Sequence, residues 1–206
     1  MTWRFVPLVG LLLFYAVGFG WRTWLHARRY GSTGIVLFRS GRFGQHARET
    51  LFFVVALMLL GEAVLAALDP RALDALGGLP ADVAAPLRPL GALLLAAGTA
   101  LMAAAQLDLG ASWRIGIDEG ARPGLVTGGL YGFTRNPIFL AMLLAFAGFT
   151  LLLPTWLSFV TLLLTIAGIR RHVLDEEAYL GRTYGAAYRA YAGRVGRFLP
   201  AVGRLR

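Results

Sequence analysis

The residues best suited to chemistry lie in the second half of the chain. Arg135 stands two residues before Pro137, where an apolar segment begins, so its guanidinium should lie beside the free backbone N–H groups of a helix N-terminus. A guanidinium and a helix end together form an anion site. The position equally suits an arginine that extends to lipid phosphate, and the residues alone leave both interpretations open.

A second group of polar residues follows the last apolar segment. Positions 177, 180, 184, 188 and 191 step by three or four, so Glu177, Leu180 and three tyrosines share one helical face. A carboxylate on such a face needs a donor partner, whereas Glu176, about 100° around the helix, can be solvated. The alternative is an acidic helix start whose tyrosines and arginines rest on lipid head groups, and spacing does not decide between the two.

Two kinds of site are excluded by composition. The chain has no cysteine, which removes disulfides, thiolate metal sites and cysteine nucleophiles. Its three histidines, His26, His46 and His172, are too far apart to form a spaced metal motif, so no metal site is expected.

The overall composition indicates a membrane protein. Of 206 residues, 57% are hydrophobic and 15% charged, with a mean hydropathy of +0.64, a balance that water-soluble domains rarely show. The net charge is +9, and every lysine-or-arginine charge in it is an arginine, since the sequence contains no lysine. A nucleic-acid-binding protein would place its basic residues on a polar surface around a modest core, so no nucleic-acid partner is expected.

Five apolar segments predict the architecture. The first three are about as long as a bilayer core requires, and the last two meet at Leu153-Pro154, where proline ends one helix and suits the start of the next. We therefore predict an all-α polytopic membrane protein with about five transmembrane helices, a C-terminal helical hairpin and a cytoplasmic amphipathic C-terminal helix. The segments are 5–21, 51–68, 89–107, 137–153 and 154–169.

The arginines predict the orientation. Six lie between the first two segments and eight from residue 170 onward, whereas aspartates outnumber arginines in the loop 69–88. Because cytoplasmic loops carry the arginine excess, we expect the N-terminus outside and the C-terminus in the cytoplasm. The arginine-rich, lysine-free composition is typical of GC-rich bacterial coding, so the plasma (inner) membrane of a bacterium is the expected location.

Two features of the first half of the chain allow more than one interpretation. The first segment could be a signal peptide, but Trp3 at one end and Trp21 and Trp24 at the other fit a retained span, and no Ala-x-Ala cleavage pattern follows. Glu62 lies within the second segment; an intramembrane carboxylate is a functional candidate, yet a hydrogen bond between helices is the favoured interpretation.

The order of motifs after residue 106 resembles the isoprenylcysteine carboxyl methyltransferase and phospholipid N-methyltransferase superfamily, whose members are integral membrane enzymes. The resemblance covers about 106–200. It rests on Leu125-Val-Thr-x-Gly-x-Tyr131, on Arg135-Asn-Pro-x-Phe139-x-Ala, on the hairpin, and on Glu176-Glu177-x-x-Leu180-x-x-x-Tyr184-Gly185-x-x-Tyr188-x-x-Tyr191-x-x-Arg194-Val-x-Arg197-Phe-Leu-Pro200.

This resemblance implies S-adenosyl-L-methionine as the cofactor and a division of the chain into N-terminal helices (1–105) and a cofactor-binding methyltransferase region (106–206). The chain departs from the family pattern at Asn136, Phe139 and Ala141, where histidine, tyrosine and glycine are commoner. A proton-transfer role of that histidine therefore cannot be carried over to Asn136. The implied cofactor-binding residues are Leu125, Val126, Tyr131, Arg135, Asn136, Pro137, Glu176, Glu177 and Leu180.

The sequence thus predicts a membrane methyltransferase whose acceptor is a lipophilic carboxylate, amine or thiol that comes from the bilayer. Tyr188 and Arg194 are predicted to contact this acceptor. The catalytic group, the oligomeric state and the methylated atom stay open. The alternative is a non-catalytic scaffold or transporter that binds anionic lipid or a partner protein; a transporter would need several polar residues facing one another at mid-membrane, and Glu62 is nearly alone there.

Overall fold

The fold is a bundle of long helices. The computed structural model describes residues 2–39, 43–116 and 124–205, so the predicted cytoplasmic Arg42 and Arg122 lie outside the described residues. Its helices are, in chain order, α1 (Val6–Tyr15), α2 (Arg22–Tyr30), α3 (Phe43–Leu68), α4 (Ala72–Ala75), α5 (Ala81–Ala84), α6 (Arg88–Leu109), α7 (Pro137–Leu152) and α8 (Trp156–Arg194).

Four described helical segments are long and apolar enough to cross a membrane. They are Trp3–Tyr30, Phe43–Leu68, Ala81–Ser112 and Trp156–Arg194, and the shorter apolar helix Pro137–Leu152 forms the first arm of the predicted hairpin. At 16 residues this arm is about 24 Å long, less than the bilayer core of about 30 Å. The prediction of an all-α polytopic membrane protein is confirmed, and each predicted apolar segment is helical except at the hairpin turn, where residues 153–155 lie between α7 and α8.

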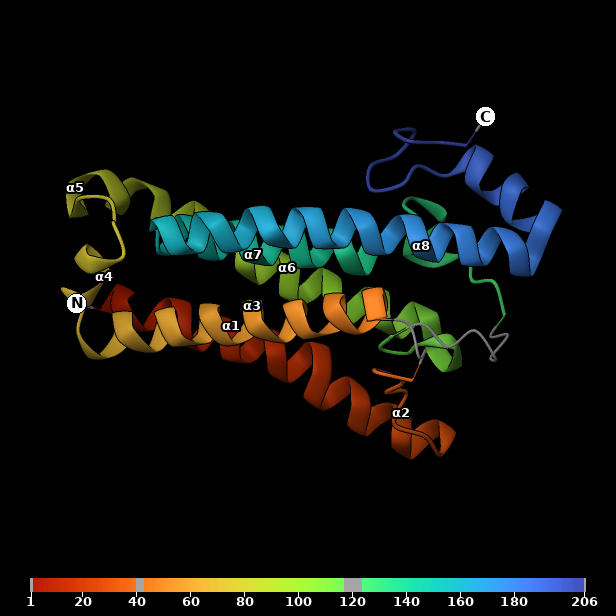
Figure 1. Cartoon of the computed structure of the whole chain (residues 1–206), viewed down its shortest axis with the longest axis horizontal. Helices are drawn as coiled ribbons and strands as arrows, with labels where there is room; N and C mark the ends of the chain where they lie inside the picture. Colours follow the sequence, from red (N-terminus) through yellow and green to blue (C-terminus); the bar gives the residue numbers. More distant parts are fainter. Residues whose placement is uncertain (1, 40–42, 117–123, 206) are drawn as a thin grey trace.

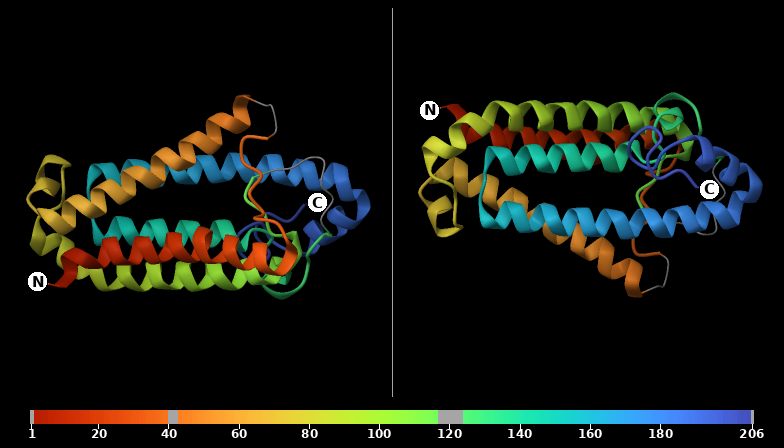
Figure 2. Two further views of the ribbon diagram at one scale, coloured as in Figure 1. Left: turned by 90° about the horizontal axis from the view of Figure 1, so that it is seen from below. Right: turned by 90° about the horizontal axis from the view of Figure 1, so that it is seen from above.

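Figure 1 shows how these helices are arranged: the N-terminus lies at the end that carries α4 and α5, and the C-terminus lies at the opposite end, beside the connections that precede α3 and α7. In Figure 2, α1, α6 and α7 run side by side, while α8 stands apart from them and α3 diverges from the bundle toward its own N-terminus. The elements that carry the predicted site therefore gather at one end of the molecule.

The first span contains a widened turn. Between α1 and α2, residues Ala16–Trp21 form a π-helical segment, η2, and the buried Gln106 of α6 donates from Nε2 to the carbonyl oxygen of Gly18 at 2.8 Å. π-Helical turns arise where a side chain from a neighbouring element engages the backbone ladder. This turn brings Phe19 to the cavity described below.

Helices α6 and α7 pack backbone to backbone through small residues. A Cβ atom on Gly98 would lie 2.7 Å from both the carbonyl oxygen of Ala141 and the amide nitrogen of Ala145, so only glycine fits there. Small residues that let helix backbones approach closely are the usual means of association in lipid, where burial of apolar surface gives no driving force. This contact fixes α7, and with it the loop that carries Arg135.

The hairpin turn is held by caps and by the preceding connection. Thr155 and Ser158 form a reciprocal capping box at the start of α8, and the hydroxyl of Thr155 also donates to the buried carboxylate of Glu62 on α3. The backbone N–H of Leu79 donates to the carbonyl oxygen of Pro154, and that of Trp156 donates to the carbonyl oxygen of Leu76. These two bonds connect the segment 69–88 to the hairpin turn. The sequence predicted that segment as a plain loop, but it contains two single-turn helices, α4 and α5.

The predicted amphipathic helix is the continuation of α8 rather than a separate element. Gly185 adopts φ 54° and ψ −120° inside it, a conformation that is strained for residues with a Cβ atom. The chain turns at this point, so the last two turns fold back toward the bundle in Figure 1. The predicted division at residue 105 falls within the unbroken helix α6.

Candidate functional site

A cavity of about 300 Å³ lies at the C-terminal end of the bundle and extends between the helices. Its polar part is formed by the connections before α7 and by α8 around Glu176. Its apolar part is formed by membrane-spanning stretches: Leu51, Phe52 and Val55 of α3, Met102 of α6, Met142 of α7, and Leu164, Gly168 and Ile169 of α8. A volume near 300 Å³ with a few polar groups is within the range of small-molecule sites.

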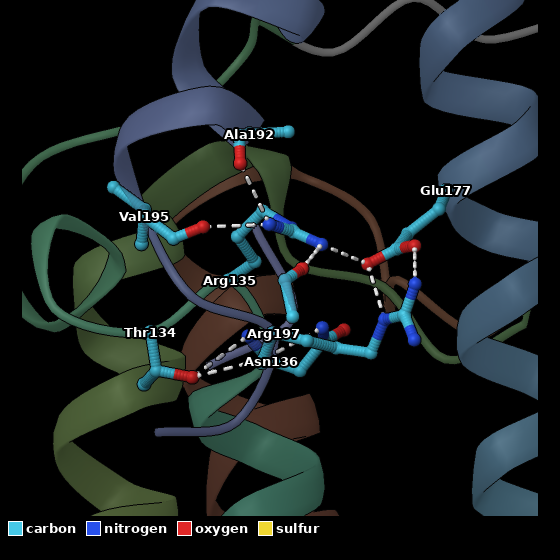
Figure 3. Close-up of polar contacts among 8 residues, drawn as sticks. Thr134, Arg135, Asn136, Glu177, Ala192, Val195 and Arg197 are labelled. Atoms are coloured by element: carbon cyan, nitrogen blue, oxygen red, sulfur yellow. Dashed lines mark hydrogen bonds and ion pairs between the residues drawn. The ribbon is translucent and has the colours of Figure 1, made fainter. Parts of the chain in front are cut away.

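Arg135 is held by the protein itself (Figure 3). Its Nη1 donates to the carbonyl oxygens of Ala192 (3.0 Å) and Val195 (2.6 Å), and its Nη2 donates to that of Gly203 (3.0 Å) and to Glu177 Oε1 (2.6 Å). The side chain is only 2% exposed. Arg135 thus fastens the C-terminal segment 192–203 to the start of α7.

Glu177 is shared between two arginines, as Figure 3 shows. Besides Arg135, it accepts from Arg197 Nε (3.0 Å) at Oε1 and from Arg197 Nη2 (2.8 Å) at Oε2, and its side chain is 10% exposed. These bonds raise the pKa of Arg197 above its usual value, which keeps this guanidinium charged. We call Arg135, Glu177 and Arg197 the arginine clasp. It supplies the donor partner that a carboxylate on this helical face requires.

The loop before α7 is bonded to the same segment. Thr134 Oγ1 (3.1 Å) and Asn136 Nδ2 (3.0 Å) both donate to the carbonyl oxygen of Arg197, and the backbone N–H of Arg135 donates to that of Gly196 (2.9 Å). The amide of Asn136 is therefore engaged in holding the chain together. Pro137 occupies the first turn of α7, where its missing N–H has no cost.

Glu176 differs from its neighbour Glu177. It lines the cavity and is half-buried, and among the described residues it has neither a hydrogen bond nor an ion pair. Tyr131 lines the same end of the cavity; burial, and then the nearby charge of Glu176, raise the pKa of its hydroxyl well above the usual range. Tyr131 is thus a neutral phenol beside a free carboxylate.

The tyrosine face, formed by Tyr184, Tyr188 and Tyr191, has residues on both sides of the break at Gly185. Tyr188 and Tyr191 meet edge to face with ring centroids 6.2 Å apart, and the hydroxyl of Tyr191 donates to the carbonyl oxygen of Tyr131 at 2.7 Å. The buried hydroxyl of Tyr188 lines the cavity and has no partner in the described part of the chain. All five predicted face positions, 177, 180, 184, 188 and 191, line the cavity, although the helix is not continuous between them.

The loop that carries Tyr131 is fixed by Asp108. Its carboxylate accepts from the backbone N–H of Leu130 at 2.7 Å, while Gly129 has φ 57° and a Cβ atom there would collide with the same carboxylate. Glycine is required at this position for both conformation and space. Asp108, at the end of α6, therefore positions the following 3₁₀ turn, Gly129–Gly132, against the cavity.

Several cavity residues were missed in the sequence. Arg114 lies over the ring of Tyr179, with its Cζ 6.0 Å from the centroid, and has no carboxylate partner among the described residues. On α3, Arg48 pairs with Asp175 of α8 at 2.9 Å, and the buried Glu49 accepts from the N–H of Phe38 (2.7 Å) and from Gln45 (2.9 Å). The helical face shared by 45, 48, 52 and 55 was the available signal, but positions 45 and 48 precede the apolar run that starts at residue 51.

The structure thus brings most of the predicted site residues to one cavity and separates two of them. Pro137 is buried in the first turn of α7 without lining the cavity, and Arg194 is exposed near the end of α8. Those that line it are Leu125, Val126, Tyr131, Arg135, Asn136, Glu176, Glu177, Leu180 and Tyr188.

Comparisons with known proteins agree with this arrangement. The sequence model of a family described as phospholipid methyltransferase matches residues 87–187. No curated protein matches the chain. Among solved structures, the fold is similar to that of a eukaryotic intramembrane Ras methyltransferase, isoprenylcysteine carboxyl methyltransferase, with a TM-score of 0.61 and 17% identity.

The similarity covers 95% of this chain and 64% of that one, so the chain spans somewhat less than two thirds of the solved enzyme's length. The matched family region contains α6, the loop with Arg135, the hairpin and the helix with Glu176 and Glu177. These elements line the cavity together with η2 and α3. The family match over 87–187 and the shared fold together support the superfamily of integral membrane methyltransferases.

Proposed function

We propose that the protein transfers a methyl group from S-adenosyl-L-methionine to a lipophilic acceptor that reaches the cavity from the bilayer. The observation that carries this proposal is the two-part cavity, which joins a polar end around Glu176 to an apolar part between membrane-spanning helices. A soluble cofactor and a membrane-borne acceptor could meet in one such space. The scaffold and transporter alternatives have no comparable support, since Glu62 is bonded to Thr155 at the hairpin turn.

The polar groups in the cavity fit this cofactor. The free carboxylate of Glu176 can accept from ribose hydroxyls, Arg114 can bind the cofactor's carboxylate, and the tyrosine faces attract a cationic sulfur. The partnerless hydroxyl of Tyr188 can donate to a bound molecule. Gly124 also lines the cavity, with open space where a Cβ atom would be, so its backbone can approach a ligand closely.

We assign two roles to the residues that the family resemblance implies. Leu125, Val126, Tyr131, Glu176 and Leu180 would contact the cofactor. Arg135, Asn136 and Glu177 would act through the arginine clasp and the bonds around it, because both Nη atoms of Arg135, the amide of Asn136 and the carboxylate of Glu177 already bond within the protein. Pro137 would act by starting α7. The clasp holds the segment after Gly185 and with it the tyrosine face against the cavity.

Methyl transfer from a sulfonium is an in-line displacement in which the positive charge on sulfur disappears. The cofactor would supply the reactive methyl group. The chain would contribute position and a shielded environment: α7 and α8 align the two ligands, and the apolar walls exclude water that would compete for the methyl group. Covalent catalysis by the protein is not required.

The apolar part of the cavity gives the acceptor a route from the lipid. Leu164 is 40% exposed on the outer surface of α8 and also lines the cavity, and Leu51 and Phe52 of α3 face the same space. We infer that the acceptor passes between α3 and the hairpin. Tyr188, at the polar end, would contact the acceptor's head group; Arg194, exposed on the last turn of α8, would meet it only outside the cavity.

We further propose that the cavity end faces the cytoplasm of a bacterium, in its plasma membrane. The described arginines of the first connection and of the chain after residue 170 lie at this end, and the aspartates of 69–88 lie at the other. Cytoplasmic sides of membrane proteins carry such an excess of positive charge. The N-terminus is then outside and the C-terminus inside, as the sequence predicts.

Calorimetric titration of the purified, detergent-solubilised protein with S-adenosyl-L-methionine tests the cofactor half of the proposal. We expect binding of micromolar affinity or tighter, and competition by the demethylated cofactor product. Incubation of the protein in native-lipid vesicles with methyl-labelled cofactor, followed by mass spectrometry of the labelled lipid, tests the acceptor half. Absence of binding would contradict the proposal as a whole.

A further inference from the structure

His172 is a cavity residue that the proposed function leaves without a role. It stands one helical turn before Glu176 on α8, and both side chains line the cavity. Residues four apart share a helix face, and this face continues toward the membrane through Gly168 and Thr165. His172 thus lies where the polar end of the cavity meets its apolar part, which is where the acceptor's head group would meet the cofactor.

The imidazole of His172 is available to a bound molecule. Its ring is half-buried and packs against Phe139 with centroids 5.2 Å apart, and no described residue hydrogen-bonds to either ring nitrogen. The two other histidines do not line the cavity. Both ring nitrogens of His26 face backbone carbonyl oxygens, those of Ser32 (2.8 Å) and Ala111 (3.4 Å). His172 is therefore the imidazole that the cavity presents to a ligand.

We propose that His172 is the general base that takes the proton from the acceptor's nucleophile during methyl transfer. This rests on the proposed function. Imidazole is the side chain whose ordinary pKa lies between 5 and 8, so it can accept a proton near neutral pH. A carboxylate or thiolate acceptor needs no base, whereas an ammonium or hydroxyl does, so the proposal also assigns the acceptor to the proton-bearing class.

The other charged groups of the cavity are compatible with this assignment. The arginines Arg48 and Arg135 are paired inside the protein with Asp175 and Glu177. In the described residues, Glu49 and Glu176 have no cationic partner and Arg114 has no carboxylate partner, so the cavity presents charges of both signs to its ligands. The titratable groups that share the cavity with His172 are Arg48 and Glu49 of α3, Arg114, Tyr131 and Arg135 before α7, and Glu176, Glu177, Tyr179, Tyr184, Tyr188 and Tyr191 of its own helix.

The step balances without further reactants. For an ammonium acceptor, one N–H proton passes to a ring nitrogen of His172, and the freed lone pair forms the new N–CH₃ bond. The S–CH₃ bond breaks, and its electron pair stays on the sulfur of the demethylated product. The imidazolium then returns its proton to water through the polar end of the cavity.

The first test compares His172→Gln with His46→Gln, a matched change at a histidine outside the cavity. In vesicles of bacterial total lipid extract with methyl-labelled cofactor, we expect H172Q to lower kcat by about 100-fold or more, as loss of a general base does, and to abolish the fall in rate below neutral pH. H46Q should keep the kcat and the pH dependence of the unmodified protein. The labelled lipid should retain its label in alkali, because an N-methyl or O-alkyl product does not hydrolyse, whereas a methyl ester releases methanol.

A further measurement does not depend on turnover. The affinity of H172Q for S-adenosyl-L-methionine by calorimetry should stay within about twofold of the unmodified protein, because the residue acts on the acceptor.

An H172Q rate and pH profile equal to those of the unmodified protein would overturn the assignment, and so would an alkali-labile product. Those results leave the proposed function standing. Failure of the unmodified protein to bind the cofactor or to label any lipid would instead remove the proposed function itself.

Discussion

Glu176 and Glu177 are neighbours in sequence but have different surroundings. Glu177 is enclosed by Arg135 and Arg197, whereas Glu176 faces the cavity without a partner in the described chain. The cause is helical geometry, since adjacent residues point about 100° apart. The same substitution at the two positions should therefore have separable effects.

Replacing Glu177 with glutamine should destabilise the protein by about 3–5 kcal/mol, because the change leaves two arginines without their shared counter-charge, one of them buried. Thermal unfolding of the variant in detergent measures this loss. Glu176→Gln is the matched control and should unfold within a degree or two of the unmodified protein. Equal unfolding temperatures for the two variants would show that the clasp contributes nothing to stability.

Glu176→Gln should instead weaken the binding of S-adenosyl-L-methionine by about tenfold or more, since a charge-assisted hydrogen bond contributes about 1.5–3 kcal/mol. Calorimetric titration gives the dissociation constant directly. Asp175→Asn is the control on the same helix, because Asp175 pairs with Arg48 at the surface and does not line the cavity. If both variants bind equally well, Glu176 does not contact the cofactor.

Among single residues, the sequence predicted those that line the site better than the hydrogen bonds that hold them. The step of three and four residues placed Glu177 with the tyrosines, and the family resemblance named Arg135 beside them. The partner of both, Arg197, lies 20 residues beyond Glu177 and after the break at Gly185, so no local spacing could indicate it. The residues left two interpretations of Arg135 open, an anion site and an anchor to lipid phosphate, whereas four oxygen atoms of the protein accept from its Nη1 and Nη2.

At the scale of elements, the contact between α6 and α7 sets the position of the loop that carries Arg135. Gly98→Ala should destabilise the protein by about 1–3 kcal/mol, because the added methyl group would lie 2.7 Å from the backbone of α7. Gly61→Ala is the control, since a Cβ atom there meets nothing within 4 Å. The unfolding temperature of each variant in detergent checks the prediction, which fails if Gly98→Ala is as stable as Gly61→Ala.

The elements themselves could be predicted where apolar length and proline position define them, as in the hairpin at Leu153-Pro154. Their ends could not. α3 begins eight residues before its apolar run, because polar residues such as Arg48 and Glu49 face the interior there rather than water. The break in α8 at Gly185 was also hidden, since Gly181 lies in the same helix without interrupting it.

At the scale of the whole molecule, the cavity is a joint product of every long helix. Phe19 of η2 and residues of α3, α6, α7 and α8 all line it, so no single motif indicates its apolar part. The family region 87–187 supplies the polar end, while α3 completes the side that faces lipid. The first half of the chain therefore contributes to the site as well as to membrane insertion.

Gly168→Phe tests most directly whether methyl transfer takes place in this cavity. Gly168 lines the cavity and a Cβ atom there meets nothing within 4 Å, while Gly61→Phe makes the same change on an exposed face of α3. The measurement is the transfer of label from methyl-labelled S-adenosyl-L-methionine to lipid in native vesicles. We predict that Gly61→Phe keeps the rate of the unmodified protein and that Gly168→Phe lowers it by at least about tenfold while unfolding at a similar temperature. Equal rates for the two variants would contradict the account.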